Sequence, residues 1–442
     1  MSDPSTAAVP ASARGTALAR LSIYSLIGLV IFFVPVEIGD KSTIVLDHAA
    51  SYLLKDARTL VIAIALLLMV YGAIEPWVSG SWRENAVTIA FSVLKVLGLA
   101  IGVAFLFGIG PEVVYAPGML PFLFDKLVLS LAIIVPLGSL ALVFLIGFGL
   151  LEFTGVLMQP VMRPIWRTPG KSAIDAVASF VGSYSVGLLI TARMYAQRHY
   201  TLREAAIIAT GFSTVSAPFM VIVAKTLNLM PAWNLYFWGC MAITFAVTAV
   251  SARIYPISRL PSEGSADPAL PEGRSRVQAA WDAGLEHAHI APPLWVSLRE
   301  TFADGLRMTA AILPSILAVG LLGLLAAKYT PVFDVLGVLL YPVTWAFGLD
   351  EPMAVARAVA SGLAEMFLPA MLMKEADVVV RFTVAVVSVS SVLFLSASIP
   401  CVIATRIPLR MRDLLLVWLQ RTFLSLVFTI PFAQAAHKLG WL

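Results

Sequence analysis

The stretch that decides the fold is Gly211-Phe212-Ser213-Thr214-Val215-Ser216, together with its counterpart Ser388-Val389-Ser390-Ser391. Each is a serine-rich segment inside an apolar run. Each run follows a short, half-polar segment that contains glycine, residues 179–185 in the first case and 361–365 in the second. Repeats of this kind, with interrupted helices at matching positions, are typical of membrane transporters. The sequence therefore predicts one arrangement that is used twice.

The composition is that of a membrane protein. Of the 442 residues, 60% are hydrophobic and 13% are charged, whereas soluble domains carry about 25% charged residues. The mean hydropathy is +0.90. The net charge of +4 comes from basic residues in loops beside apolar runs, which indicates the positive-inside bias rather than nucleic-acid binding. Cys240 and Cys401 lie inside apolar runs, so we expect neither a structural disulfide nor a zinc site.

We predict an all-α polytopic membrane protein with about nine transmembrane helices and two re-entrant helical hairpins. A helix needs about 20 apolar residues to cross the hydrocarbon. The runs of this length are 21–36, 60–78, 86–107, 127–159, 205–225, 233–254, 307–327, 382–405 and 414–432. The stretches 173–192 and 353–373 are also long, but glycine with small or polar neighbours interrupts each near its middle. We interpret these two stretches as the hairpins.

The distribution of Lys and Arg favours hairpins that enter and leave on the same side of the membrane, with a cytoplasmic N-terminus. The first hairpin then enters from the cytoplasm and the second from outside, so the two repeats are inverted. We place the protein in the bacterial cytoplasmic membrane as a multi-pass protein. The predicted segments are a disordered cytoplasmic tail (1–20), an N-terminal three-helix scaffold (21–126), the first repeat (127–255), a cytoplasmic linker (256–300) with a short surface helix, the second repeat (301–436) and an external tail (437–442).

Three blocks of sequence resemble a known family. They are Gly149-Leu150-Leu151-Glu152-Phe153, the segment 159–170 (Gln-Pro-Val-Met-Arg-Pro-Ile-Trp-Arg-Thr-Pro-Gly) and the serine-rich segment 211–216. They are similar to the bacterial YjiH family, part of the nucleoside-recognition, or Gate, domain group. That group also includes the spore-maturation membrane proteins and the membrane part of the ferrous-iron transporter. The resemblance covers most of the chain from about Leu18. It implies a Gate-type transporter architecture, distantly related to concentrative nucleoside carriers, but it does not supply the substrate.

The interrupted helices also predict the substrate site. A helix break in lipid leaves N–H and C=O groups without partners, so breaks persist only where protein or a water-filled cavity satisfies them. Hydroxyl clusters suit a polar solute such as a nucleoside, amino acid or small peptide. The alternatives are that small residues merely permit close helix packing and that hydroxyls bond to their own helix. The predicted substrate-binding residues are Gly182, Ser183, Tyr184, Ser185, Ser213, Ser216, Ser361, Gly362, Glu365, Ser388 and Ser391.

Two acids are candidates for the coupling-ion or proton site. Glu365 lies in the break of the second hairpin, where an ionised carboxylate is costly unless it is paired or hydrated. It can carry a proton or bind Na⁺ or a substrate amine, and an ion pair with Arg357 is the alternative explanation. Glu152 in the first repeat has a counterpart, Asp334, in the second, so this pair either brackets the site or fixes the helix breaks. We expect H⁺ or Na⁺ as the coupling ion and no cofactor.

Enzymatic activity is not expected, because the sequence contains no Walker loop, no HExxH and no CxxC motif, and its five histidines fall in loops or tails. The sequence predicts a secondary active transporter of a small polar solute that works by alternating access and is driven by an ion gradient. Its expected partners are the solute, the lipid membrane and further copies of the chain, without nucleic acid. The alternative is a non-transporting membrane subunit that docks a partner protein through the linker.

Overall fold

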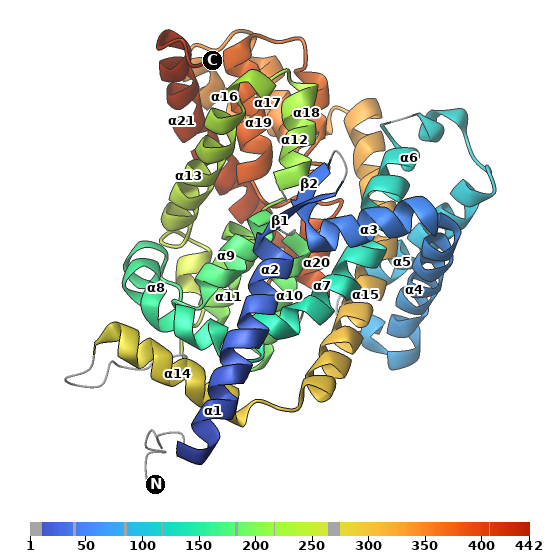
Figure 1. Cartoon of the computed structure of the whole chain (residues 1–442). Helices are drawn as coiled ribbons and strands as arrows, with labels where there is room; N and C mark the ends of the chain where they lie inside the picture. Colours follow the sequence, from blue (N-terminus) through green and yellow to red (C-terminus); the bar gives the residue numbers. More distant parts are fainter. Residues whose placement is uncertain are drawn as a thin grey trace.

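The computed structural model is almost entirely helical (Figure 1). The structure describes residues 11–38, 41–83, 86–116, 118–181, 184–215, 217–263, 275–405 and 407–442. One antiparallel hairpin, β1 (Pro35–Ile38) and β2 (Lys41–Ile44), interrupts the helices near the N-terminus. Among the described residues, 7 helices are long and apolar enough to cross a membrane. Two further helices are each broken into two halves. Together with the long helices, they match the number of transmembrane helices predicted from the sequence.

The first repeat contains a long helix, a short amphipathic helix, a two-armed hairpin, a broken helix and a second long helix. In chain order these are α7 (Leu129–Ile146), α8 (Leu150–Trp166), the hairpin α9 (Ser172–Val181) with α10 (Tyr184–Ala196), the broken helix α11 (Leu202–Gly211) with α12 (Ala217–Thr226), and α13 (Trp233–Ser251).

The second repeat has the same order of elements. They are α15 (Leu294–Tyr329), α16 (Val332–Ala346), the hairpin α17 (Pro352–Ser361) with α18 (Leu368–Leu372), the broken helix α19 (Val378–Ser390) with α20 (Ser398–Ala404), and α21 (Met411–Lys438). In Figure 1 the first hairpin lies toward the end of the molecule that carries the N-terminus, and the second lies at the opposite end. We call these the linker side and the opposite side. The predicted inverted-repeat fold class is confirmed.

Short polar motifs set where the half-helices begin. The Thr201 side chain accepts a hydrogen bond from the Glu204 backbone N–H at 3.2 Å, and the Glu204 carboxylate accepts one from the Thr201 backbone N–H at 2.8 Å. This capping box starts α11. Asp377 caps α19 by accepting from the Val379 N–H at 2.8 Å. The second half-helices α12 and α20 carry Pro218 and Pro400 in their first turns, where a missing N–H costs little.

The N-terminal elements form a scaffold, and the last two of its helices pack against α15. They are α1 (Ala11–Ala19), the π-helical turn η1 (Arg20–Tyr24), α2 (Ser25–Phe33), α3 (Val45–Asp56), α4 (Arg58–Ser79) and α5 (Ala86–Leu106). Glycines let α4 and α5 lie directly on α15. A Cβ added at Gly72 would lie 1.7 Å from the Ala310 carbonyl oxygen, and one at Gly98 would lie 1.8 Å from the Pro314 carbonyl oxygen. The three helix backbones are therefore in contact.

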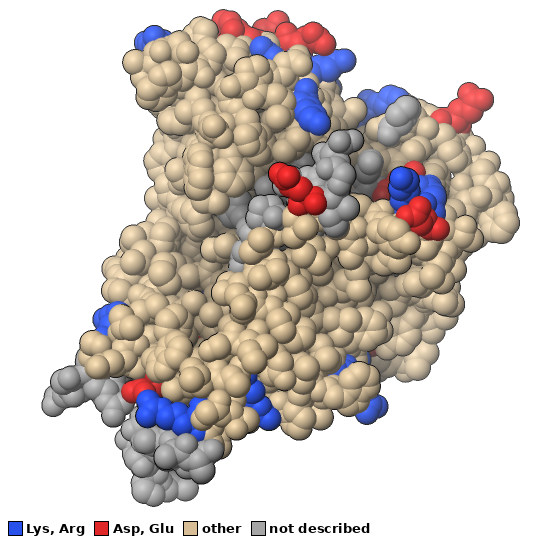
Figure 2. All heavy atoms as spheres, viewed as in Figure 1, with Lys and Arg blue, Asp and Glu red and all other residues tan. Residues whose placement is uncertain are grey.

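Charged side chains gather toward the two ends of the molecule on the face shown in Figure 2, and a broad band of other residues separates them. Many large apolar side chains within the long helices are exposed, including Leu67 on α4, Trp238 on α13 and Leu322 on α15. An apolar band between charged ends is the distribution that a lipid bilayer selects. Together with the long apolar helices, it identifies a multi-pass membrane protein.

One predicted membrane run was wrong. The apolar run 127–159 forms two helices, because α7 ends at Ile146 and α8 begins at Leu150. Gly149 adopts a left-handed conformation with φ of +95°, and a Cβ there would lie 2.1 Å from the Gly284 carbonyl oxygen. Glycine is the residue that tolerates both conditions. Hydrophobicity alone did not reveal this turn.

Several predicted boundaries also differ from the structure. Residues 11–19 of the tail predicted to be disordered form α1, which packs against the linker helix α14 (Arg276–Ile290) through apolar residues such as Ala17 and Leu285. The linker is shorter than predicted, because α15 begins at Leu294. The scaffold segment also contains the β1–β2 hairpin and α3, and its last residues 120–126 continue as helix into α7. At the C-terminus, α21 extends to Lys438.

Candidate functional site

The break between α19 and α20 is the centre of the candidate site. Residues 391–397 leave the helix, and Val392 has a positive φ of 64°. The tip of the second hairpin pairs with this extended segment. The Leu395 N–H donates to the Leu363 carbonyl at 2.7 Å, and the Ser396 N–H donates to the Ala364 carbonyl at 3.0 Å. The N–H groups freed by the break between α19 and α20 thus bond to carbonyls freed at the tip of the second hairpin. A nonpolar environment requires such pairing of backbone groups.

Glu365 lies at this junction and is 2% exposed. The Ser396 hydroxyl donates a hydrogen bond to its Oε2, and the Phe367 N–H donates to its Oε1 at 3.4 Å. The alternative of an ion pair with Arg357 is wrong, because the Arg357 Nε lies 3.3 Å from Asp334 Oδ1 instead. Within the described part of the chain, Glu365 makes no ion pair. A buried carboxyl group without a cationic partner is available to exchange a proton or a cation.

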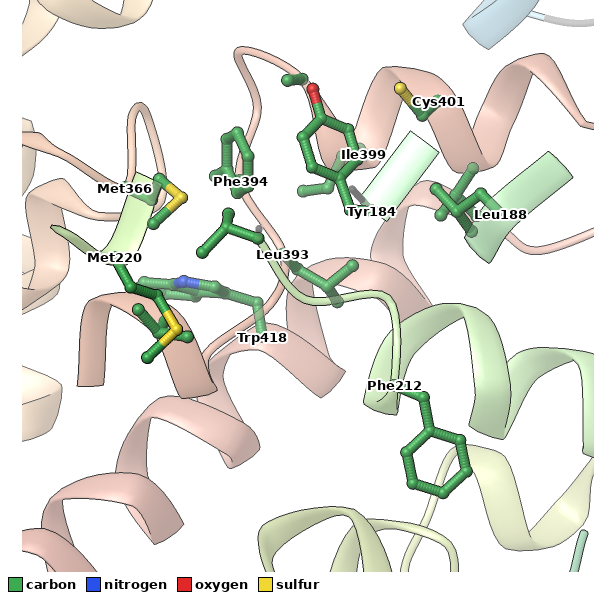
Figure 3. Close-up of a cluster of buried hydrophobic side chains, with 14 of the residues drawn as sticks. Tyr184, Leu188, Phe212, Met220, Met366, Leu393, Phe394, Ile399, Cys401 and Trp418 are labelled. Carbon is green, nitrogen blue, oxygen red and sulfur yellow. The ribbon is translucent and has the colours of Figure 1, made fainter. Parts of the chain in front are cut away.

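The first hairpin reaches the same region through Tyr184, the first residue of α10. Its buried ring meets the edge of the Phe394 ring, with 5.8 Å between the centroids and an interplanar angle of 77°. Figure 3 shows the two rings side by side, with Met366 of the second hairpin beyond Phe394. The Tyr184 hydroxyl has no hydrogen-bond partner among the described residues. The hairpins therefore converge on the break between α19 and α20.

The break of the first repeat lies between α11 and α12. Phe212, Ser213, Thr214 and Val215 are all buried there. Phe212 packs against Phe245 and Trp166, with ring centroids 5.4 and 5.9 Å apart. In Figure 3 the loop that follows Phe212 runs toward Leu393 in the other break. The two interrupted helices therefore present their non-helical segments to the same part of the interior.

The arms of the first hairpin are held together by buried polar contacts. The Tyr200 hydroxyl donates to Asp175 Oδ2 at 2.5 Å, and the Thr191 hydroxyl donates to Asp175 Oδ1 at 3.4 Å. Asp175 is fully buried near the start of α9. Gly187 permits the close approach, because a Cβ there would lie 1.8 Å from the Ser179 hydroxyl. Asp175 therefore links α9 to α10 and to Tyr200.

The predicted serines and glycines divide into three groups. Gly182, Ser183 and Ser216 lie outside the described residues. The hydroxyls of three others donate to carbonyls of the helix in which they lie or which they follow: Ser361 to Ala358 at 2.6 Å, Ser391 to Ser388 at 3.3 Å, and Ser213 to Ile208 at 3.4 Å. Gly362 lies in the turn after α17, and Ser185 and Ser388 are buried in α10 and α19. A substrate role for these residues stays a prediction.

The structure does not bring Glu152 to the hairpin tips. Its Oε1 lies 2.9 Å from the Lys171 Nζ and 3.6 Å from the His287 Nδ1 of the linker helix. Glu152 is the third residue of α8, as Asp334 is the third residue of α16, and each pairs with a basic residue of the hairpin segment that follows it. This matched geometry agrees with the interpretation that the two acids fix the arrangement of the helices.

The ion pair between Glu152 and His287 gives a prediction about the linker. We expect His287→Ala to increase amide hydrogen exchange of α14 about threefold, because a partly exposed pair of this kind contributes up to about 1 kcal/mol. The matched control is His289→Ala, since His289 is exposed on the same helix. Exchange rates measured by mass spectrometry that are equal in both variants would contradict a docking role for His287.

A cavity of about 630 Å³ opens on the linker side between α4, α5, α10 and α15. Its lining includes Glu75, Lys95, Arg193, Asp304 and Arg307. The Arg193 guanidinium donates to the Thr301 hydroxyl on α15. Lys95 shares this cavity with residues of four other helices, α4, α10, α15 and α20 (Ser398–Ala404). The cavity borders the second arm of the first hairpin.

Sequence reasoning missed Arg421. It lies in the apolar run 414–432, forms part of α21 and is 0% exposed. The available signal was a single arginine inside a helix long enough to cross the membrane, which by itself indicates a functional residue.

Comparison with known proteins gives one family and two relatives. The Gate family, described as nucleoside recognition, matches residues 128–230. The uncharacterized protein BpOF4_10220 of Alkalihalophilus pseudofirmus is 30% identical over 434 residues, which cover 94% of each chain. The sporulation integral membrane protein YlbJ of Bacillus subtilis is 35% identical over 80 residues, 18% of this chain and 19% of that protein.

Two solved structures are also similar, and both are described as CNTnw variants in an outward-facing state. The first has a TM-score of 0.45 and 16% identity, and the match covers 93% of this chain and 99% of that one. The second has a TM-score of 0.46 and 15% identity, with 95% and 99% covered.

Proposed function

The chain belongs to the Gate, or nucleoside-recognition, family of membrane proteins, and on this premise we propose that it is a secondary active transporter of a small polar solute. The solute class is a nucleoside, an amino acid or a small peptide, and H⁺ or Na⁺ drives transport by alternating access. We place the protein in the bacterial cytoplasmic membrane with its N-terminus and linker in the cytoplasm, as the basic residues favour.

The observation that carries this proposal is the junction of the second hairpin with the break between α19 and α20. Glu365 is buried there and bonds to Ser396 across the junction. Burying a carboxyl group without a cationic partner costs free energy, and so does interrupting a helix inside the membrane. A passive scaffold gains nothing from either feature, whereas a carrier uses both to bind and release solute and ion.

The route to the cytoplasm is proposed to pass through the cavity on the linker side. That cavity lies between the scaffold helices α4 and α5 and the first hairpin. Its acidic and basic side chains keep it hydrated, so a polar solute can leave through it. In the inverted arrangement, the second hairpin closes the route to the opposite side of the membrane. Alternating access then moves the hairpins and broken helices against the scaffold.

The alternative of a docking subunit lacks a supporting observation. Part of the apolar surface of α14 already packs within this chain. Leu285 and Ala288 cluster with Ala17 and Leu21, and the partly exposed Trp281 ring meets Phe153 at 5.8 Å. The linker helix therefore packs one part of its apolar surface internally, while Val277 and Ile290 remain exposed. Stable co-purification of a partner protein, without any solute binding, would favour the alternative.

The first experiment is a thermal-shift screen of the purified protein with uridine, leucine and dialanine, in sodium and in potassium salts. A ligand that binds the folded state at 100 times its Kd adds about 2.7 kcal/mol of stability. We expect one solute class to raise the Tm and a substitution at Glu365 to change its ion dependence. Absence of a shift with every solute class would contradict a solute carrier.

A further inference from the structure

Arg421 is a fully buried cation that sits between the two broken helices. Its Nη2 donates to the carbonyl oxygen of Ser390 at 2.7 Å and lies 3.5 Å from that of Gly211, and its Nη1 donates to the Thr248 hydroxyl at 3.0 Å. Ser390 is the last residue of α19, and Gly211 is the last residue of α11. One side chain thus contacts the C-terminal ends of both first half-helices.

No described acidic residue forms a salt bridge with Arg421. A guanidinium in this position needs another source of negative charge, because transferring an unpaired charge out of water is costly. Each helix C-terminus carries roughly −0.5 elementary charge, so the two ends together supply about −1. The ends of α11 and α19 therefore match the single positive charge of Arg421.

Broken helices in transporters offer their C-terminal ends and unwound carbonyls to cations such as Na⁺. Here the ends belong to different repeats, and a side chain from a third helix already contacts both. The neighbouring polar groups complete the arrangement: Thr248 also donates to the Gly211 carbonyl at 3.0 Å, and the Ser390 hydroxyl donates to the Ser425 hydroxyl at 2.7 Å.

We propose that Arg421 is a built-in cation that occupies the position between the two half-helix C-terminal ends in place of a bound inorganic cation. It joins the two repeats at their breaks and makes the folded core independent of Na⁺ at this position. The inference deepens the proposed transport function, because it concerns which cation the broken helices hold. Its test measures stability and does not depend on transport.

The test compares Arg421→Ala with the wild type in chloride salts of choline, sodium and guanidinium at equal, low millimolar cation concentration. We expect Arg421→Ala to lower the Tm by roughly 5 °C or more in choline. Guanidinium or Na⁺ should restore part of that loss, because the vacated position again takes a cation. The matched control is Arg412→Ala on the same helix, where the side chain is 70% exposed, and its Tm should not respond to the cation.

If the Arg421→Ala variant does not fold, the proposal is tested by comparing the Tm of Arg421→Met with that of the wild type. Arg421→Met fills the space without charge, and we expect a Tm below that of the wild type. A methionine variant at least as stable as the wild type would overturn the proposal, as would a folded alanine variant that is insensitive to every cation. A Na⁺-specific rise in the wild-type Tm that persists in Glu365→Gln would also overturn it. A solute carrier that fails these tests would remain a carrier.

Discussion

Glu365→Gln is expected to abolish ion-coupled uptake of the solute while leaving the protein folded. Glutamine keeps the size of the side chain. Its one amide oxygen can accept from the Phe367 N–H, and its NH₂ group can donate to the Ser396 hydroxyl oxygen, which donates to Glu365 in the wild type. It cannot ionise, so it can neither release a proton nor bind a cation by charge. We expect uptake into proteoliposomes to fall at least about 100-fold, in line with the loss of a group essential to the coupled step.

The Tm separates this effect from misfolding, because the substitution changes one buried atom and should shift the Tm by only a few degrees. The matched control is Glu375→Gln, whose side chain lies just beyond the second hairpin and is 88% exposed. It should transport normally. Normal coupled uptake by well-folded Glu365→Gln would exclude Glu365 as the coupling group.

Gly98→Ala should produce a large loss of stability. The added Cβ would lie 1.8 Å from the carbonyl oxygen of Pro314, which belongs to the backbone of α15 and cannot rotate away. Helices α5 and α15 must then separate along their contact. Overpacking of this kind costs about 3 kcal/mol, and we expect a clear fall in the Tm and in the fraction recovered as a monodisperse peak.

Gly102→Ala is the control for this prediction, because it lies one turn further along the same helix. Its added Cβ would lie 3.1 Å from the terminal methyl of Met69 and 3.2 Å from a methyl of Leu317. Flexible side-chain ends can yield by a few tenths of an ångström. We expect the Tm of this variant to remain near that of the wild type. Equal Tm values for the two alanine variants would show that α5 does not rest directly on the α15 backbone.

Local sequence signals predicted the parts of the fold where glycine, serine and proline disturb an apolar run. The interruption of the second hairpin at Gly362 is of this kind. Glu365 was recognisable because an acid inside a membrane-depth segment is costly wherever it lies. The inverted order of the repeats followed from the same interruptions and from the distribution of basic residues.

Features that depend on contacts between distant segments could not be predicted. The turn at Gly149 is fixed by the approach of Gly284, and the helix α1 is stabilised by α14, which follows more than two hundred residues later. Arg421 was passed over because its partners are backbone carbonyls at the ends of two other helices. Every residue has a backbone carbonyl, so the sequence does not show which carbonyls accept hydrogen bonds from an arginine.

The strand-like pairing of Leu395 and Ser396 with Leu363 and Ala364 restricts how the protein can move. Pulling the second hairpin away from the interrupted helix would leave two N–H groups and two carbonyls without partners in an apolar interior. This pairing therefore opposes a hinge motion of the second hairpin by itself. In the proposed transport cycle, the second hairpin is expected to move with α19 and α20 as one rigid body relative to the scaffold.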